Sequence, residues 1–152
     1  MGSRQGFAGD EPGAQGGQLS TSPEIIRLFY ELWEATLTGR EYILAADPLD
    51  SFDKVPRSEA PDVQRVLRYL NRLGHLIAHG VLDAEFASSL VGKEVIRTLT
   101  RMKPALNEAR SKRSDPRYLE YLDTLLKVCQ DAYPDFEPRY YEGERRGLGL
   151  TI

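Results

Sequence analysis

Apolar residues recur at intervals of three and four along most of the chain between residues 23 and 133. In the first such segment, residues 23–37, the large apolar residues on one helical face are Ile25, Leu28, Phe29, Leu32 and Trp33. This period predicts an amphipathic α-helix that packs one face against a core. Ser22 followed by Pro23 is a typical helix start, because serine can cap the free amides and proline suits the first turn. Gly39 is expected to interrupt this helix.

A second helix is predicted over residues 61–79. Its apolar face consists of Val63, Val66, Leu67, Leu70, Leu73, Gly74 and Ile77. Gly80 suits the left-handed residue that ends a helix. Beyond it, Asp83 is expected to cap a short helix over residues 84–91, which Gly92 ends.

Two further helices follow. Residues 93–112 contain Pro104, which removes a backbone donor and predicts a kink near Lys103. Asp115 and Pro116 then form a cap and first-turn pair that is expected to open a helix over residues 117–133. Its inward-facing residues are predicted to be Leu119, Leu122, Leu125, Leu126 and Cys129.

No segment alternates between apolar and polar residues as a β-strand would. The predicted fold is therefore all-α, a single compact bundle of four to five short helices over residues 23–133. Residues 1–22 contain six of the thirteen glycines and almost no large apolar residue, so we expect a disordered tail. Residues 134–152 are expected to form an extended tail rich in tyrosine and arginine.

Composition narrows the function mainly by exclusion. The formal net charge of −3 argues against a general nucleic-acid binder. The single cysteine, Cys129, excludes an internal disulfide framework and is expected to be a buried apolar residue in a reducing compartment. No apolar run approaches the ~20 residues needed to span a bilayer, and the N-terminus lacks the apolar segment of a secretory signal. We therefore expect a cytoplasmic protein without a membrane span.

The order of these segments resembles that of a known family. "RLFYELWEATLTGREYILAA" is followed by an acidic, proline-containing loop, then by residues 66–106 and the tyrosine-rich "DPRYLEYLDTLLKVC". This order is similar to that of an uncharacterised bacterial family of all-helical domains, a domain of unknown function that often follows a membrane anchor. The resemblance covers about residues 23–130. It implies a helical fold and no reaction, cofactor or catalytic residue, and the anchored arrangement is not expected here.

The two histidines, His75 and His79, raise the question of a metal site. They stand one helical turn apart, which is the spacing of zinc ligands on a helix. Zinc needs a third protein ligand, however, and the glutamate of the HExxH motif is replaced by Leu76. The chain has no other histidine, so we expect no metal site and no bound cofactor.

The same stretch allows a ribonuclease hypothesis. Helical ribonucleases of the HEPN type use an arginine and a histidine close together in sequence, and the pairs Arg68/His75 and Arg72/His79 each have six residues between them. Histidine could act as general base on a 2′-hydroxyl while arginine stabilises the phosphorane charge. The polar residue that commonly follows the arginine is absent from both pairs. The resemblance is one of spacing alone, and we keep it as the alternative function.

A simpler interpretation is that this stretch is the outer face of a helix. On a helical wheel the cationic side chains fall together, opposite the apolar stripe: Arg65, Arg68, Arg72, His75 and His79. Long cationic side chains on the outer face keep an amphipathic helix soluble. Such a basic stripe can also dock an acidic surface of a partner protein.

The C-terminal tail is the second candidate for partner binding. It combines aromatic and cationic residues, which are enriched at interface hot spots: Tyr133, Phe136, Arg139, Tyr140, Tyr141, Arg145 and Arg146. A tail that packs back across the bundle is the competing interpretation. We therefore expect a non-catalytic interaction module or accessory subunit with a protein partner, and the composition is also compatible with self-association.

Overall fold

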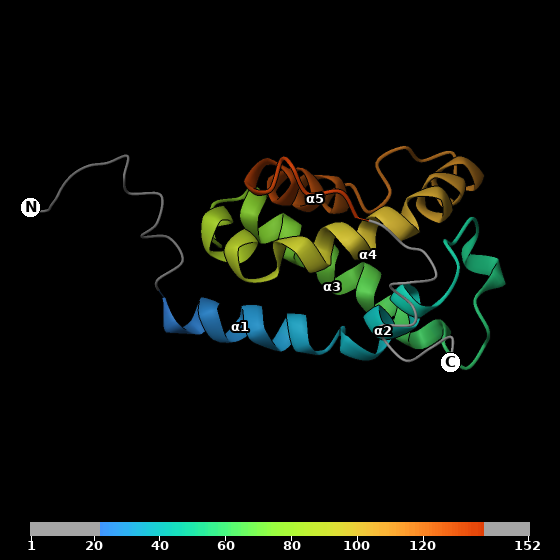
Figure 1. Ribbon diagram of the computed structural model, residues 1–152, viewed down its shortest axis with the longest axis horizontal. Helices are drawn as coiled ribbons and strands as arrows, with labels where there is room; N and C mark the ends of the chain where they lie inside the picture. Colours follow the sequence, from blue (N-terminus) through green and yellow to red (C-terminus); the bar gives the residue numbers. More distant parts are fainter. Residues whose placement is uncertain (1–21, 139–152) are drawn as a thin grey trace, which may run out of the picture.

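The computed structural model describes residues 22–138. Within this range the chain forms α-helices, one short 3-10 helix and no strand, so the all-α prediction is confirmed (Figure 1). The elements are α1 (Pro23–Glu34), α2 (Leu37–Ala45), η2 (Phe52–Lys54), α3 (Ala60–Ala78), α4 (Ala84–Lys112) and α5 (Tyr121–Ala132). The tail predicted over residues 1–22 lies outside the described residues except for Ser22.

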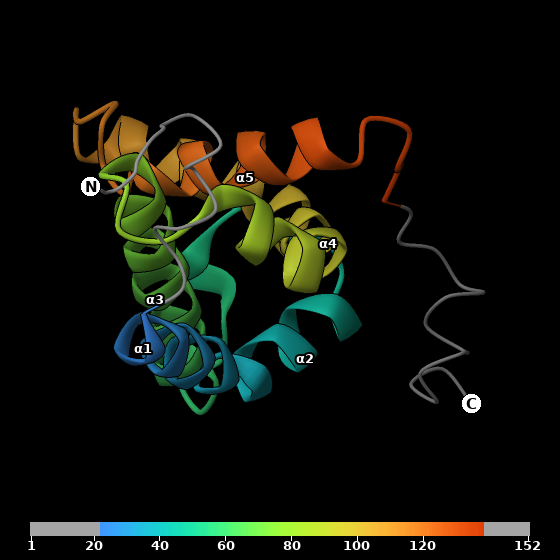
Figure 2. The same ribbon diagram turned by 90° about the vertical axis from the view of Figure 1, so that its left-hand side faces the viewer.

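The helices surround one apolar core. α3 packs against α1, α2 and α5, while α4 packs against α2, α5 and η2. Figure 1 shows α1 and α2 following one another along one side of the molecule, with α5 on the opposite side of α4. In Figure 2, turned by 90°, α3 and α4 both lie between α5 and the layer formed by α1 and α2. The core includes Phe29, Ile43, Val66, Leu70, Leu73, Val95, Ile96, Met102, Leu122 and Leu125.

The sequence predicted that the first helical segment breaks at Gly39. In the structure the break lies at Ala35–Thr36 instead. The Thr36 hydroxyl bonds back to the Trp33 carbonyl, which competes with regular helical bonding. Gly39 instead lies inside α2 and is buried. A Cβ atom there would come within 2.4 Å of the Asp62 carbonyl oxygen of α3. The glycine therefore permits the close approach of α2 and α3.

The predicted break at Gly92 is also wrong, because α4 runs without interruption through this residue. A Cβ atom at Gly92 would lie 2.6 Å from the ring of Tyr133. The glycine provides room for that ring, and the helix-forming residues around it carry α4 onward. The predicted cap is confirmed, since the Asp83 carboxylate accepts a hydrogen bond from the Phe86 amide at 3.0 Å.

Pro104 disturbs α4 locally without ending it. The Leu49 amide donates to the Arg101 carbonyl, and the Leu49 carbonyl accepts from the Ala105 amide, each at 3.1 Å. In a regular helix the Ala105 amide would donate directly to the Arg101 carbonyl. A residue of the α2–η2 loop thus bridges the turn at Pro104, and α4 continues to Lys112.

Arg101 secures the end of α2 from the side of α4. Its side chain is 2% exposed. Its Nε donates to the Ile43 carbonyl at 3.0 Å, and its Nη2 donates to the Ala46 carbonyl. The last carbonyls of a helix lack partners within the helix, so the guanidinium satisfies groups that burial would otherwise leave unpaired.

The last helix begins later than Asp115 and Pro116 had suggested. Residues 115–120 form turns, and α5 starts at Tyr121. Leu119 has a φ of 54°, a left-handed conformation that no helix can include. The Arg110 guanidinium holds this turn, because it donates to the carbonyls of Tyr118 at 2.8 Å and Leu119 at 3.2 Å. The expected cap and first-turn pair therefore belongs to a turn before the helix.

Candidate functional site

The cationic residues of α3 lie on its solvent-facing side, as the helical wheel predicts. Arg68, Arg72, His75 and His79 are exposed, whereas Arg65 is half-buried and pairs with Asp62 at 3.1 Å. Among the described residues, no carboxylate forms an ion pair with Arg68 or Arg72. Two arginines one helical turn apart thus keep their charge available to a ligand.

The beginning of α5 meets α3 at Gly74. A Cβ atom at Gly74 would come within 2.0 Å of the Tyr121 carbonyl oxygen, so only glycine allows this crossing. As a result, the Tyr121 ring lies 4.6 Å from the His75 ring and 5.9 Å from the His79 ring. The two imidazole rings are themselves 4.3 Å apart. The two helices thus form an aromatic cluster beside the two arginines.

A shallow surface groove runs along this crossing, and we call it the α3–α5 groove. It is lined by Arg68, Tyr69, Asn71, Arg72, His75, Leu119 and Tyr121. The described residues of its lining include two arginines and no aspartate or glutamate. The arginines can bind a carboxylate or phosphate in a bidentate manner, while the rings and Leu119 offer apolar contact.

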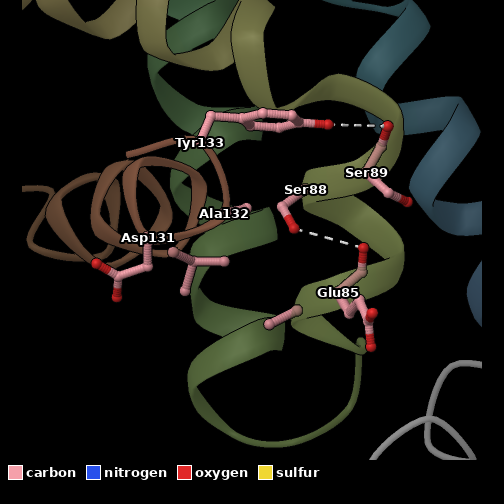
Figure 3. Close-up of a pocket in the computed structure, with 8 residues that line it drawn as sticks. Glu85, Ser88, Ser89, Asp131, Ala132 and Tyr133 are labelled. Atoms are coloured by element: carbon pink, nitrogen blue, oxygen red, sulfur yellow. Dashed lines mark hydrogen bonds between the residues drawn. The ribbon is translucent and has the colours of Figure 1, made fainter. Parts of the chain in front are cut away.

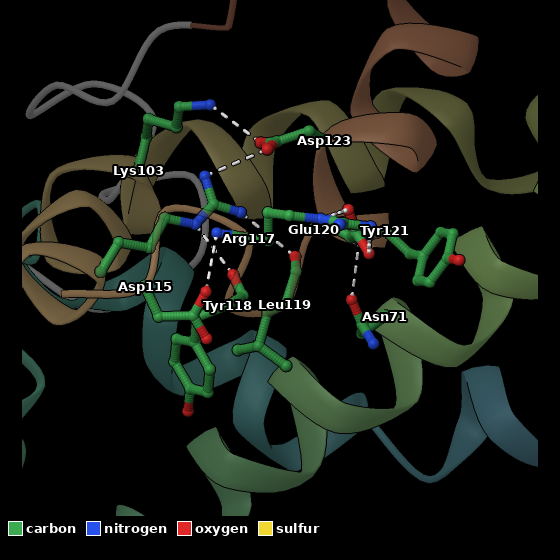
Figure 4. A network of polar contacts seen from close by, with 10 residues as sticks. Asn71, Lys103, Asp115, Arg117, Tyr118, Leu119, Glu120, Tyr121 and Asp123 are labelled. Atoms are coloured by element: carbon green, nitrogen blue, oxygen red, sulfur yellow. Dashed lines mark hydrogen bonds and ion pairs between the residues drawn. The ribbon is translucent and has the colours of Figure 1, made fainter. Parts of the chain in front are cut away.

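Polar contacts fix the α5 side of the groove (Figure 4). The Asn71 side-chain oxygen accepts from the Tyr121 amide at 3.1 Å and so caps α5 from the neighbouring helix. Asp123 pairs with Lys103 at 3.1 Å and with Arg110 at 3.0 Å. The left-handed Leu119 costs about 1 kcal/mol or more, and strained residues of this kind are concentrated at functional sites.

The residues of the alternative, ribonuclease hypothesis lie on the same exposed face of α3. His79 Nδ1 is 3.0 Å from the His75 carbonyl oxygen, so one of its ring nitrogens already has a hydrogen-bond partner. Arg72 and His75 line the groove, whereas His79 lies just beyond its lining residues. Nothing in this geometry tests cleavage of RNA, and the hypothesis stays a prediction. Within residues 22–138 no group of three or more histidine, cysteine or carboxylate side chains is placed to hold a metal ion.

The two described aromatic residues of the C-terminal segment contact α4. The Tyr133 hydroxyl donates to the Ser89 carbonyl at 3.4 Å (Figure 3). The Lys93 ammonium lies 5.3 Å from the Tyr133 ring and 5.7 Å from the Phe136 ring. The other predicted partner-binding residues lie outside the described part of the chain: Arg139, Tyr140, Tyr141, Arg145 and Arg146.

A second surface pocket lies between the beginning of α4 and the end of α5 (Figure 3). Its two serine hydroxyls bond back to their own helix, Ser88 to the Glu85 carbonyl at 3.4 Å and Ser89 to the Phe86 carbonyl at 3.0 Å. In the part of the chain that the structure describes, no histidine lines this pocket to act as a general base. Cys129 is fully buried nearby in α5, and burial raises its pKa to about 12. Neither feature provides an activated nucleophile.

The comparison with protein families decides the classification. A family model described as "Domain of unknown function (DUF4760)" matches residues 20–128. The chain belongs to the DUF4760 family. The match confirms the family resemblance, and it includes every residue that lines the α3–α5 groove. No curated protein and no solved structure matches this chain.

The sequence alone could identify only part of this site. The helical wheel placed five residues on one face of α3, namely Arg65, Arg68, Arg72, His75 and His79. Asn71, Leu119 and Tyr121 were missed, because they become neighbours only where α5 crosses α3. The one available signal was Gly74, a glycine within the apolar stripe of a helix, which often marks a close approach of backbones.

As for the membrane, no helix within residues 22–138 has the length and apolar character to span a bilayer.

Proposed function

We propose that this DUF4760 domain is a non-catalytic interaction module, an accessory subunit that binds an acidic segment of a partner protein in the α3–α5 groove. In this proposal Arg68 and Arg72 bind carboxylates of the partner. Tyr121 and the two histidines contact an apolar or aromatic side chain next to those carboxylates. The proposed location is the cytoplasm, a reducing compartment that suits a single buried cysteine.

One observation carries the proposal: two exposed arginines, which have no carboxylate partner within residues 22–138, stand beside an aromatic cluster in a groove. Several exposed cations have a carboxylate partner, among them Lys54, Lys112, Arg117 and Lys127. Arg68 and Arg72 have none among the described residues, and they differ from other such arginines in that both line the same groove. Arginine and tyrosine are also among the residues that contribute most to binding energy at protein interfaces.

The C-terminal segment is proposed as a second contact of the partner. Tyr133 and Phe136 are half-buried and Lys93 is exposed, so this edge of α4 combines aromatic and cationic groups. Arg139, Tyr140, Tyr141, Arg145 and Arg146 continue the same composition. A partner with acidic and apolar residues therefore suits both surfaces.

The direct test is charge reversal in the groove. A tagged chain carrying Arg68→Glu and Arg72→Glu would be compared with the unchanged chain in native affinity purification. Arg27→Glu together with Arg57→Glu is a matched control, because both residues are exposed arginines with no ion pair among the described residues. A further bait ending at Asp135 separates the contribution of the C-terminal segment from that of the groove.

The proposal predicts a stoichiometric partner that the unchanged chain and the control retain and the groove variant loses. Retention of the partner should also fall as the salt concentration is raised from 50 to 500 mM, because the contact is between exposed charges. Over this range the Debye length decreases from roughly 14 Å to roughly 4 Å. Equal retention by the groove variant and the control would refute the α3–α5 groove as the binding site. Loss with the bait ending at Asp135 alone would assign binding to the C-terminal segment.

A further inference from the structure

The polar side chains that line the α3–α5 groove offer mainly hydrogen-bond donors. Arg68 and Arg72 stand one helical turn apart on α3, and neither side chain forms an ion pair or a hydrogen bond with another described residue. Each guanidinium carries five N–H donors in a planar fork and no acceptor. These two residues therefore offer the groove two positively charged donor groups.

The Asn71 side chain adds a neutral donor, because the start of α5 fixes its orientation. Its oxygen accepts from the Tyr121 amide at 3.1 Å, and a backbone N–H can bond only to the oxygen of a side-chain amide. The amide nitrogen therefore faces away from the Tyr121 backbone (Figure 4). No described residue accepts a hydrogen bond from this nitrogen. Asn71 thus provides two further N–H donors beside Arg72 in the groove lining.

The two carboxylates at the beginning of α5 are bound by cations outside the groove. Glu120 accepts from the Arg117 guanidinium at 2.9 and 3.1 Å, through both of its oxygens. Asp123 pairs with Lys103 and Arg110. Neither carboxylate is among the described residues that line the groove. The charge of the two groove arginines is therefore not neutralised from the α5 side, and the groove favours an anion.

This donor set suits one phosphate better than separate carboxylates. Residues four apart on a helix have Cβ atoms about 6 Å apart, so the long side chains of Arg68 and Arg72 can reach the same anion. A carboxylate has one charge and two oxygens, which a single guanidinium fork already engages. A phosphate monoester carries nearly two charges at pH 7 and has three strong acceptor oxygens. It can accept from both arginines and from Asn71 at the same time.

The aromatic cluster begins directly beyond the arginines. His75 follows Arg72 by three residues, about 4.5 Å along the axis of α3 at about 1.5 Å per residue. The His75 ring is exposed and lies 4.6 Å from the Tyr121 ring. An aromatic ring that is joined to the phosphate can therefore contact these rings while the phosphate lies at the arginines. A phosphotyrosine side chain carries both groups, whereas phosphoserine has no ring.

We propose that the α3–α5 groove binds a phosphorylated tyrosine side chain of the partner protein. This inference rests on the proposed function, because it specifies the acidic group that enters the groove: one phosphate takes the place of separate carboxylates. Arg68, Arg72 and Asn71 bind the phosphate, and His75 and Tyr121 contact the ring. Phosphorylation of the partner then controls its binding to this domain.

A protein ligand suits the molecule better than RNA, although RNA also combines phosphates with aromatic rings. Binding along an RNA backbone calls for cations at several successive phosphates, and the chain has a formal net charge of −3. The groove lining contains only two arginines among its described residues. Each phosphodiester also carries one charge, whereas the phosphate of phosphotyrosine carries nearly two.

Peptide titration of the full 152-residue chain at pH 7.5 and constant ionic strength tests the inference, with amide shifts recorded by nuclear magnetic resonance. The probes are blocked tripeptides with phosphotyrosine, tyrosine, glutamate or phosphoserine between two glutamates. We expect the phosphotyrosine peptide to bind at least about tenfold more tightly than the other three, because only it combines the dianion with a ring. Its shifts should concentrate in residues 68–75 and 119–121, and the Arg68→Glu, Arg72→Glu variant should lose them.

Asn71→Asp is the sharpest single substitution. Aspartate keeps an oxygen that caps α5 as well as asparagine does, so the urea midpoint should not fall. It replaces the N–H donors by a carboxylate, which repels the phosphate and should weaken the phosphotyrosine peptide by about tenfold or more. Asn107→Asp is the matched control, since Asn107 is an exposed residue of α4 outside the groove, and it should leave the affinity unchanged.

The outcomes separate this inference from the proposed function. Equal binding of the glutamate and phosphotyrosine peptides in the groove would overturn the inference and leave the proposed function standing. Equal binding of the phosphoserine peptide would overturn the assignment to tyrosine. If no peptide shifts the groove residues, the inference is wrong, and charge reversal in affinity purification still decides the proposed function. Tighter binding of hexauridylate than of the phosphotyrosine peptide would overturn the choice of a protein ligand.

Discussion

Gly74→Ala tests the crossing of α3 and α5 on which the groove depends. In an exposed helical position this change stabilises a protein by about 1 kcal/mol, because alanine has the higher helix propensity. At Gly74 the added methyl group would come within 2.0 Å of the Tyr121 carbonyl oxygen and 2.9 Å of its carbonyl carbon. Both atoms belong to the backbone, so no side-chain rotation can relieve the contact.

The size of the effect follows from the shift that this contact requires. To restore an ordinary separation of about 3.4 Å, the first turn of α5 has to move by more than 1 Å, which breaks the Asn71 cap and loosens the packing of Leu122 and Leu125. Overpacking a core in this way costs about 1–3 kcal/mol, and loss of a helix cap costs about 1 kcal/mol. After the gain in helix propensity is subtracted, the expected net loss is about 1–3 kcal/mol.

Urea unfolding followed by circular dichroism measures this loss as a lower midpoint at unchanged slope. Gly92→Ala is the matched control, because its methyl group would clash only with the Tyr133 ring, which can swing away from α4, and would make an ordinary contact with the Ser88 side chain. The control should therefore change the free energy of unfolding by less than about 1 kcal/mol. A Gly74→Ala variant as stable as the unchanged protein would show that α5 does not pack closely on α3, and the groove as described would be wrong.

Three further predictions concern single residues. Arg101→Met should lower the free energy of unfolding by about 3 kcal/mol, since the buried Ile43 carbonyl and the partly buried Ala46 carbonyl lose a charged donor. Arg57→Met on the surface should change it by less than about 0.5 kcal/mol, and equal urea midpoints for the two variants would refute the bonding described for α2. The Cys129 thiol, with a pKa raised to about 12, should stay protonated and resist iodoacetamide at pH 9 in the folded protein and react after unfolding; rapid modification of the folded chain would contradict its burial. Purified protein should leave RNA intact with and without divalent cations. If the protein cleaves RNA, and if Arg72→Ala and His79→Ala each abolish the cleavage, the ribonuclease alternative would be established instead.

The fold class was predictable because the helical period of apolar residues is a local property. The amphipathic faces of α1, α3 and α5 could be read directly from the sequence, and so could the Asp83 cap and the left-handed Gly80, whose φ is 73°. Two of the errors in helix boundaries arose at glycines. Gly39 and Gly92 weaken an isolated helix, but in the folded protein each one makes room for a group from a distant part of the chain, and this packing decides that the helix continues.

The start of α5 and the groove were not predictable for a related reason. Asp115 and Pro116 are a sound local signal for a helix start, yet the turn that follows is held by Arg110 of α4 and capped by Asn71 of α3. Such contacts join residues that are far apart in the sequence, so the periodic pattern of apolar residues does not reveal them. The cationic stripe of α3 was visible beforehand, whereas its aromatic neighbour Tyr121 required the crossing at Gly74.

The most direct test of the central claim is a nuclear magnetic resonance titration of this 152-residue chain with the partner that it retains in affinity purification. Amide shifts that concentrate in residues 68–79 and 119–121, and that disappear in the Arg68→Glu, Arg72→Glu variant, are the result that we predict. Shifts confined to α1 and α4, with the α3–α5 groove unaffected, would contradict the account.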